Sequence, residues 1–139
     1  MKKGISLALA LILTLAILTG CTAGSSTESD ADAVREAVDY IDGTNGVEVD
    51  YAKALEQLTP LADDGNSYAM FALGYMYSNG YGVELSSEKA SEWYTKAADA
   101  GYADAMLCLA YMYENGVGVE KDLDKADEWS TRAQQNGAQ

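Results

Sequence analysis

Apolar residues between positions 66 and 79 recur at the spacing of an α-helix. Ala69, Met70, Ala72, Leu73, Met76 and Tyr77 follow an i, i+3, i+4, i+7 pattern. Phe71 and Tyr75 add a second apolar face, which predicts a helix packed between neighbours. Gly80 follows Asn79 and supplies the left-handed conformation that ends a helix.

A second helix with one apolar side is predicted to begin after Ser86. Its apolar side carries Ala90, Trp93, Tyr94 and Ala97, and Gly101 follows its end. Ser86 is a residue type that accepts hydrogen bonds from the unpaired N–H groups at a helix start. Helix, glycine turn, helix and glycine turn together predict a helical hairpin.

This unit recurs with a period of 36 residues. Residues 65–100 and 101–136 are identical at 18 of 36 positions without a gap. A degenerate copy over residues 29–64 is predicted to cap the N-terminal end, with Ala33 and Val34 aligned to Ala69 and Met70. The expected N-cap residues of the three second helices are Asp50, Ser86 and Asp122.

The recurring residues resemble the Sel-one-like repeat, a relative of the tetratricopeptide repeat. They are Leu73, Gly74, Tyr77, Gly80, Gly82, Ala90, Trp93 and Gly101 in one copy, and Leu109, Tyr113, Gly116, Gly118, Ala126 and Trp129 in the next. The resemblance implies an all-α fold, a right-handed α-solenoid of about six helices in antiparallel pairs. It places the domain at residues 30–139, with repeats at 30–64, 65–100 and 101–137. The role it implies is scaffolding or protein binding.

Large side chains are expected to fill the spaces between helix pairs. Trp93 and Trp129 are predicted to lie in the core, so Trp93→Ala should cost about 3–5 kcal/mol. Gly74 is expected to allow close approach of helices, and Cys108 to be a buried small residue.

The N-terminal residues predict export and lipid attachment. Lys2 and Lys3 precede an apolar run at residues 5–18, whose helix would span about 21 Å and so fall short of a bilayer core of about 30 Å. The run ends in Leu-Thr-Gly-Cys at positions 18–21, which resembles the lipobox of bacterial lipoproteins. We therefore expect a signal peptide at 1–20, lipidation of Cys21, a flexible tether at 21–29, and anchoring in the cell envelope.

The charge of the chain narrows the range of partners. The formal net charge is −13, and removal of Lys2 and Lys3 would leave 7 basic and 22 acidic side chains. Such a surface repels phosphate backbones, so nucleic-acid binding is disfavoured and a basic protein or peptide would be attracted. Membrane contact is expected from the lipid alone.

No constellation of catalytic or metal-binding residues stands out. The chain has no histidine, which removes the commonest general base and zinc ligand. Residues 42–46 begin like a calcium loop, but Lys53 stands where the glutamate ligand belongs. We predict no enzyme activity, no cofactor and no metal.

An aromatic stripe remains as the candidate partner-binding surface. Phe71, Tyr75, Leu107 and Tyr111 share one side of successive first helices, and either pack against a neighbouring helix or form an exposed patch. The favoured function is a lipid-tethered protein-interaction module. An immunity or inhibitor protein for an envelope-acting toxin is an alternative, and a cell-wall enzyme or carbohydrate binder is a third. The oligomeric state is open, since an uncapped last repeat could form a dimer.

Overall fold

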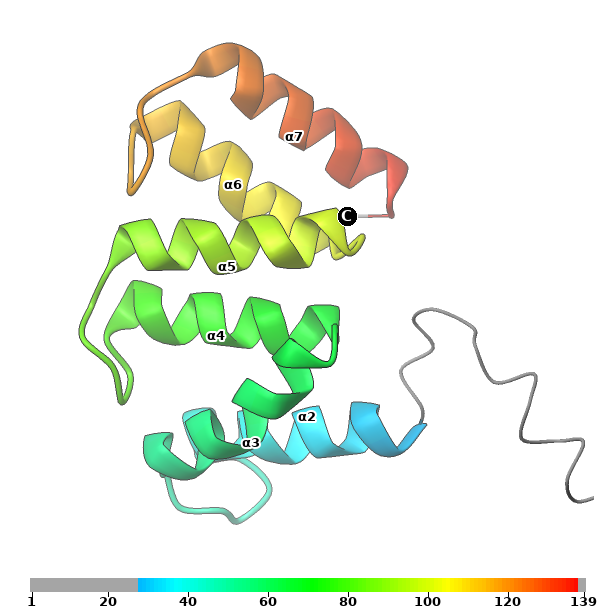
Figure 1. The fold of residues 1–139 in the computed structure, drawn as a ribbon, viewed down its shortest axis with the longest axis vertical. Helices are drawn as coiled ribbons and strands as arrows, with labels where there is room; N and C mark the ends of the chain where they lie inside the picture. The colour runs from blue at the N-terminus through cyan, green and yellow to red at the C-terminus, as the bar shows by residue number, and fades with distance from the viewer. Residues whose placement is uncertain (1–27, 138–139) are drawn as a thin grey trace, which may run out of the picture.

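The computed structural model describes residues 28–137, which form three stacked helix pairs (Figure 1). Their helices are α2 (Glu28–Asp42), α3 (Tyr51–Asp63), α4 (Ser67–Asn79), α5 (Ser87–Asp99), α6 (Ala103–Asn115) and α7 (Leu123–Gln135). The prediction of an all-α helical-repeat fold is confirmed. The predicted signal peptide and Cys21 lie outside the described residues, as does most of the predicted tether. Within residues 28–137, no helix is long and apolar enough to span a bilayer.

The second helices α3, α5 and α7 begin at the predicted N-caps. The side chains of Asp50, Ser86 and Asp122 accept hydrogen bonds from the backbone N–H three residues later. Each of these bonds satisfies one of the donors left unpaired at a helix start. The predicted starting positions of the second helices are therefore confirmed in all three repeats.

Glycines allow the turns of the second and third repeats to lie close to the preceding repeat. A Cβ at Gly82 would lie 2.7 Å from the Cβ of Tyr51, and one at Gly118 would lie against the backbone of Ser87. Tyr51 and Ser87 are the first residues of α3 and α5, so each turn rests on the start of the second helix before it. Both glycines have positive φ angles, near +68°, which a side chain disfavours.

Two apolar clusters hold the pairs together. Val34, Leu58, Leu73 and Met76 belong to the first cluster, between α2, α3 and α4. Tyr94, Met106, Leu109 and Met112 belong to the second, between α5, α6 and α7. Leu73, Leu109, Ala90 and Ala126 are all buried, as the repeat pattern requires.

The tryptophans are only partly buried, so their predicted place in the core is wrong. Trp93 packs against the first cluster from outside, toward the preceding pair, and Trp129 does the same at the second cluster. The enclosed ring is that of Tyr94, which is 5% exposed. A Cβ at Gly74 would lie 2.7 Å from this ring, so the glycine accommodates an aromatic side chain instead of a helix backbone.

The first helix is shifted by one residue from the ungapped alignment. The N–H of Gly43 bonds to Asp39 just as the N–H of Gly80 bonds to Met76, so α2 matches α4 at a lag of 37 residues. The predicted alignment of Ala33 and Val34 with Ala69 and Met70 is therefore wrong, because the two residues correspond to Met70 and Phe71. The turn after α2 holds one extra residue, and Thr44 and Asn45 donate hydrogen bonds to the Asp39 carboxylate at 2.6–3.0 Å. These bonds hold the pKa of Asp39 below its ordinary value.

Both ends of the described array are polar. In α2, Asp32, Arg35, Glu36 and Asp39 replace the buried Ala69, Ala72, Leu73 and Met76 of α4. In α7, Asp127, Ser130 and Gln134 replace the buried Ser91, Tyr94 and Ala98 of α5. Polar ends are what a solenoid needs to stay soluble. The outer face of α7 is therefore mostly polar, with Leu123 as an exposed apolar residue at its start, and the dimer considered from the sequence stays a prediction.

Candidate interaction surface

The predicted aromatic stripe is exposed along α4 and α6. The exposed fractions are 39% for Tyr75, 39% for Leu107 and 60% for Tyr111, while Phe71 is partly buried. The alternative in which Tyr75 and Tyr111 pack against a neighbouring helix requires both side chains to be enclosed, and neither is. Their use in binding stays a prediction.

Further aromatic rings extend the stripe at both ends of α4. Tyr75 meets Tyr81 edge-on, with ring centroids 5.8 Å apart, and Tyr81 stacks on Tyr51 at 4.8 Å. At the other end, Phe71 lies 5.0 Å from Tyr102, which stacks on Tyr68 at 5.7 Å. We call the surface of Tyr68, Phe71, Tyr75, Tyr81, Tyr102, Leu107 and Tyr111 the tyrosine face.

Sequence reasoning missed Tyr68, Tyr81 and Tyr102 in this surface. Tyr81 stands between the two turn glycines Gly80 and Gly82, and Tyr102 is the first residue before α6. Neither residue recurs between the two repeats, because Val117 stands at the position of Tyr81 in the next repeat and Asn66 at the position of Tyr102 in the preceding one. A search for recurring residues therefore discards them. The signal that could have identified them was their aromatic character at positions that do not recur.

Burial and nearby carboxylates act together on the tyrosine face. Burial raises the pKa values of Tyr68 and Tyr75, and the charge of Asp42 raises both further. Burial also raises the pKa of Tyr102 to about 12, with a smaller effect from Asp104. Carboxylates near Tyr68, Tyr75 and Tyr102 thus act with burial to disfavour ionisation of these three phenols.

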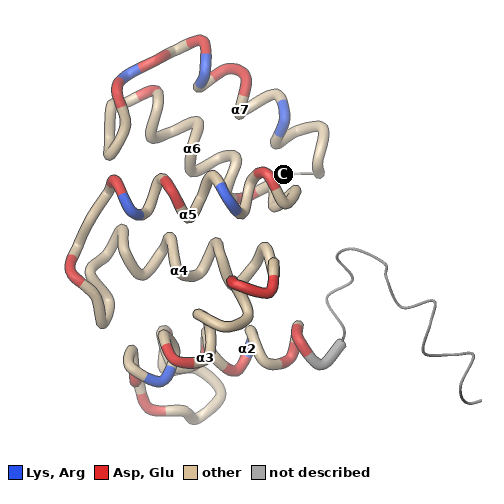
Figure 2. Tube along the Cα trace, viewed as in Figure 1, with Lys and Arg blue, Asp and Glu red and all other residues tan. Residues whose placement is uncertain are grey.

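In the second and third repeats, basic residues are confined to the second helices and the turn before α7. Lysine and arginine occur along α3, α5 and α7 but not on α4 or α6 (Figure 2). Helix α4 has no charged residue, and α6 carries only Asp104 and Glu114. The tyrosine face is thus an uncharged aromatic strip bordered by acidic residues.

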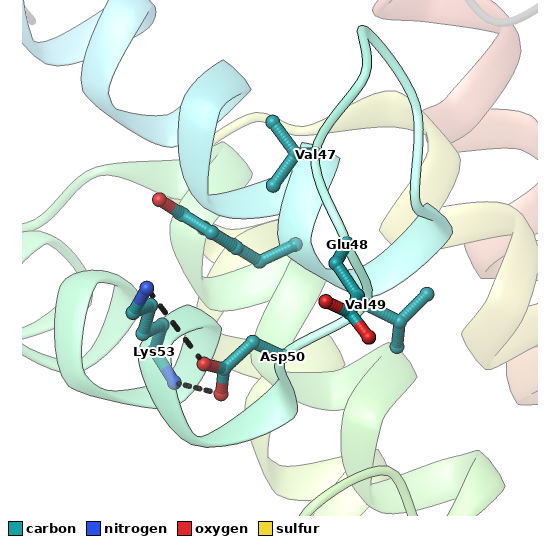
Figure 3. Close-up of a pocket in the computed structure, with 6 residues that line it drawn as sticks. Val47, Glu48, Val49, Asp50 and Lys53 are labelled. Carbon is teal, nitrogen blue, oxygen red and sulfur yellow. Dashed lines mark hydrogen bonds and ion pairs between the residues drawn. The ribbon is translucent and has the colours of Figure 1, made fainter.

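A shallow hollow lies beside each of the turns after α2 and α6. The first is lined by Tyr40, Val47, Glu48, Val49, Asp50 and Lys53 (Figure 3), and the second by the corresponding residues of the third repeat. Lys53 lies 3.9 Å from the Asp50 carboxylate and over the Tyr40 ring. Lys53 thus pairs with both Asp50 and Tyr40, and Asp50 caps α3. We therefore assign the hollow a structural role.

The described residues offer little for catalysis. They contain no cluster of three residues that could hold a metal ion. Cys108 is partly buried, less than predicted, and burial raises the pKa of its thiol. A raised pKa lowers the thiolate fraction, which makes this cysteine a poor nucleophile.

The comparisons with known proteins agree with the helix pairs. The family model of the Sel1 repeat matches residues 40–66, 67–102 and 103–137. A Sel1 repeat protein from Oxalobacter formigenes superposes with a TM-score of 0.74 at 27% identity, over 78% of this chain and 43% of its own. A protective antigen present in uropathogenic Escherichia coli strains, with an SLR fold, superposes at 0.69 and 34% identity, over 78% of this chain and 23% of its own.

Helicobacter pylori cysteine rich protein B has the same fold at 22% identity, with a TM-score of 0.66 over 84% of this chain and 94% of its own. A search of curated proteins finds no match. The chain spans less than half of the first two similar structures. On its three repeats, it belongs to the Sel1 repeat family, whose fold generally serves as a protein–protein interaction module.

Proposed function

We propose that this protein is a membrane-tethered interaction module of the cell envelope that binds a polypeptide on its tyrosine face. The exposure of Tyr75, Leu107 and Tyr111 on successive first helices carries the proposal. Exposed aromatic residues contribute large contact areas at interfaces. Enzymatic activity is not part of the proposed role.

Site-specific crosslinking in cells tests the binding surface. A photoreactive phenylalanine analogue at position 75 or 111 should crosslink to the same envelope protein. The same analogue at position 92, an exposed site on α5, serves as the control. A partner captured equally from all three positions would contradict binding at the tyrosine face.

The lipid anchor is proposed from the residues around Cys21. The basic start, the short apolar run and the Leu-Thr-Gly-Cys ending support it. Labelling with an alkyne fatty acid should mark the protein and place it in the membrane fraction. Cys21→Ser should lose both properties, whereas Cys108→Ser should keep both. A label retained in Cys21→Ser would refute lipidation at this residue.

A further inference from the structure

The second helices pair their cations with aromatic rings. A lysine or arginine lies over a ring at 4.0–5.4 Å from its centroid in five places: Lys53 on Tyr40, Lys89 on Tyr77, Lys96 on Trp93, Lys125 on Tyr113 and Arg132 on Trp129. All five cations belong to α3, α5 or α7. Two of these rings, Trp93 and Trp129, lie on the second helices themselves, and the other three lie on the first helices. Cation–π contact is therefore a recurring use of the basic residues of the second helices.

The rings of the tyrosine face have no such cation among the described residues. The five pairs use Lys53, Lys89, Lys96, Lys125 and Arg132, none of which belongs to α4 or α6. Of the first helices, only α2 carries a base, Arg35, and its guanidinium lies 3.1 Å from Asp32. Arg35 acts on the phenol of Tyr68, where Asp42 and Asp39 oppose it. The charges on the rest of the tyrosine face are acidic, with Asp42 acting on Tyr75 and Asp104 on Tyr102.

Resting on the proposed function, we infer that the polypeptide bound at the tyrosine face presents arginine or lysine side chains to Tyr75, Tyr81 and Tyr111. Each cation would lie over an aromatic ring, as Lys96 does over Trp93 at 4.0 Å. Exposed carboxylates at Asp42, Asp104 and Glu114 supply the opposite charge. An acidic or nucleic-acid partner is repelled by the same carboxylates.

Selection from a random 12-residue peptide library, displayed on phage, tests this inference. The full-length chain is the bait, and the variant with Tyr75→Ala and Tyr111→Ala is the matched control. Peptides enriched on the wild-type chain but not on the control should contain more arginine and lysine than the unselected library. A set rich in acidic or uncharged apolar peptides would overturn the inference yet leave binding at the tyrosine face intact. Identical selections on both baits would overturn the binding surface itself.

Affinity measurements on one selected peptide separate local contact from net charge. Each of Tyr75→Ala and Tyr111→Ala should weaken binding by about two- to fivefold, the range for an exposed cation–π contact. Asp42→Asn should weaken binding more than Glu92→Gln, which removes the same charge from the exposed side of α5. Equal losses from these two carboxylate variants would mean that net charge alone attracts the peptide, and would refute specific contact.

Discussion

The contact between Gly74 and Tyr94 gives a quantitative test of packing between α4 and α5. An alanine at position 74 would place its Cβ 2.7 Å from two carbons of the Tyr94 ring. Overpacking of this kind costs about 1–3 kcal/mol, whereas alanine in place of glycine inside a helix gains about 1 kcal/mol. Gly74→Ala should therefore be neutral to destabilising by about 2 kcal/mol.

The first repeat shows which second change should reverse the sign. There Ala37 and Leu58 occupy the corresponding positions, and both are fully buried. In a Tyr94→Leu background the clash is absent, so Gly74→Ala should stabilise the fold by about 1 kcal/mol. The two substitutions should then show a coupling energy of about 1–3 kcal/mol.

Urea denaturation of the wild-type chain, both single variants and the double variant measures this coupling. The midpoints should be compared at equal denaturant dependence, so that only stability differs. Independent sites add to within about 0.5 kcal/mol. A coupling energy below that value would refute the contact between Gly74 and the Tyr94 ring.

Three further predictions follow from residues of the second and third repeats. Gly118→Ala should cost about 2–4 kcal/mol in urea denaturation, because it combines positive φ with a clash at Ser87, whereas Gly101→Ala, with open space around it, should cost about 1–2 kcal/mol. Trp93→Ala should cost about 1–3 kcal/mol in the same assay, less than an enclosed ring would, and a larger loss would contradict its partial burial. Burial raises the pKa of Tyr94 to about 12, against about 10 in the unfolded chain. The stability that the neutral phenol contributes is therefore complete below pH 10 and is lost as the pH rises toward 12. Tyr94→Phe should lose less stability than the wild-type chain over that range, measured by circular dichroism.

The recurring residues made the second and third repeats predictable from the sequence. Ser86 and Asp122 are N-cap types at equal spacing, and Gly80 and Gly116 end the preceding helices. Local backbone chemistry decides these features, so they can be deduced without knowledge of packing.

The position of α2 could not be predicted by the same reasoning. Its extra turn residue breaks the period, and Asp39 stands where the second repeat has Met76. A terminal helix loses the apolar residues that would face a preceding repeat, so the alignment loses its signal where the packing changes. That Tyr94 is buried instead of the adjacent Trp93 could not be predicted for a related reason, because Ser130 replaces Tyr94 in the third repeat.

The tyrosine face was only half visible in the sequence. Tyr75 and Tyr111 recur, so helical spacing placed them together, but their exposure depends on how far successive first helices stand apart. Tyr81 joins them through a contact with Tyr75 that spans the end of α4. Distances between helices and the conformations of turns depend on how the helices pack together, so the sequence pattern alone does not give them.

The charged outer positions of α2 have a consequence for how such an array can lengthen. A repeat added before α2 would bury Asp32, Arg35, Glu36 and Asp39 at once, which is costly for unpaired charges. A copy of the unit containing α4 and α5, inserted directly after the original, would leave the packing of α3 on α4 intact and would meet α6 as the original does. Growth by internal duplication therefore creates one new junction, between α5 and the second copy of α4, and buries none of the charged residues of α2. Each added unit would extend the array by one more first helix without altering either end.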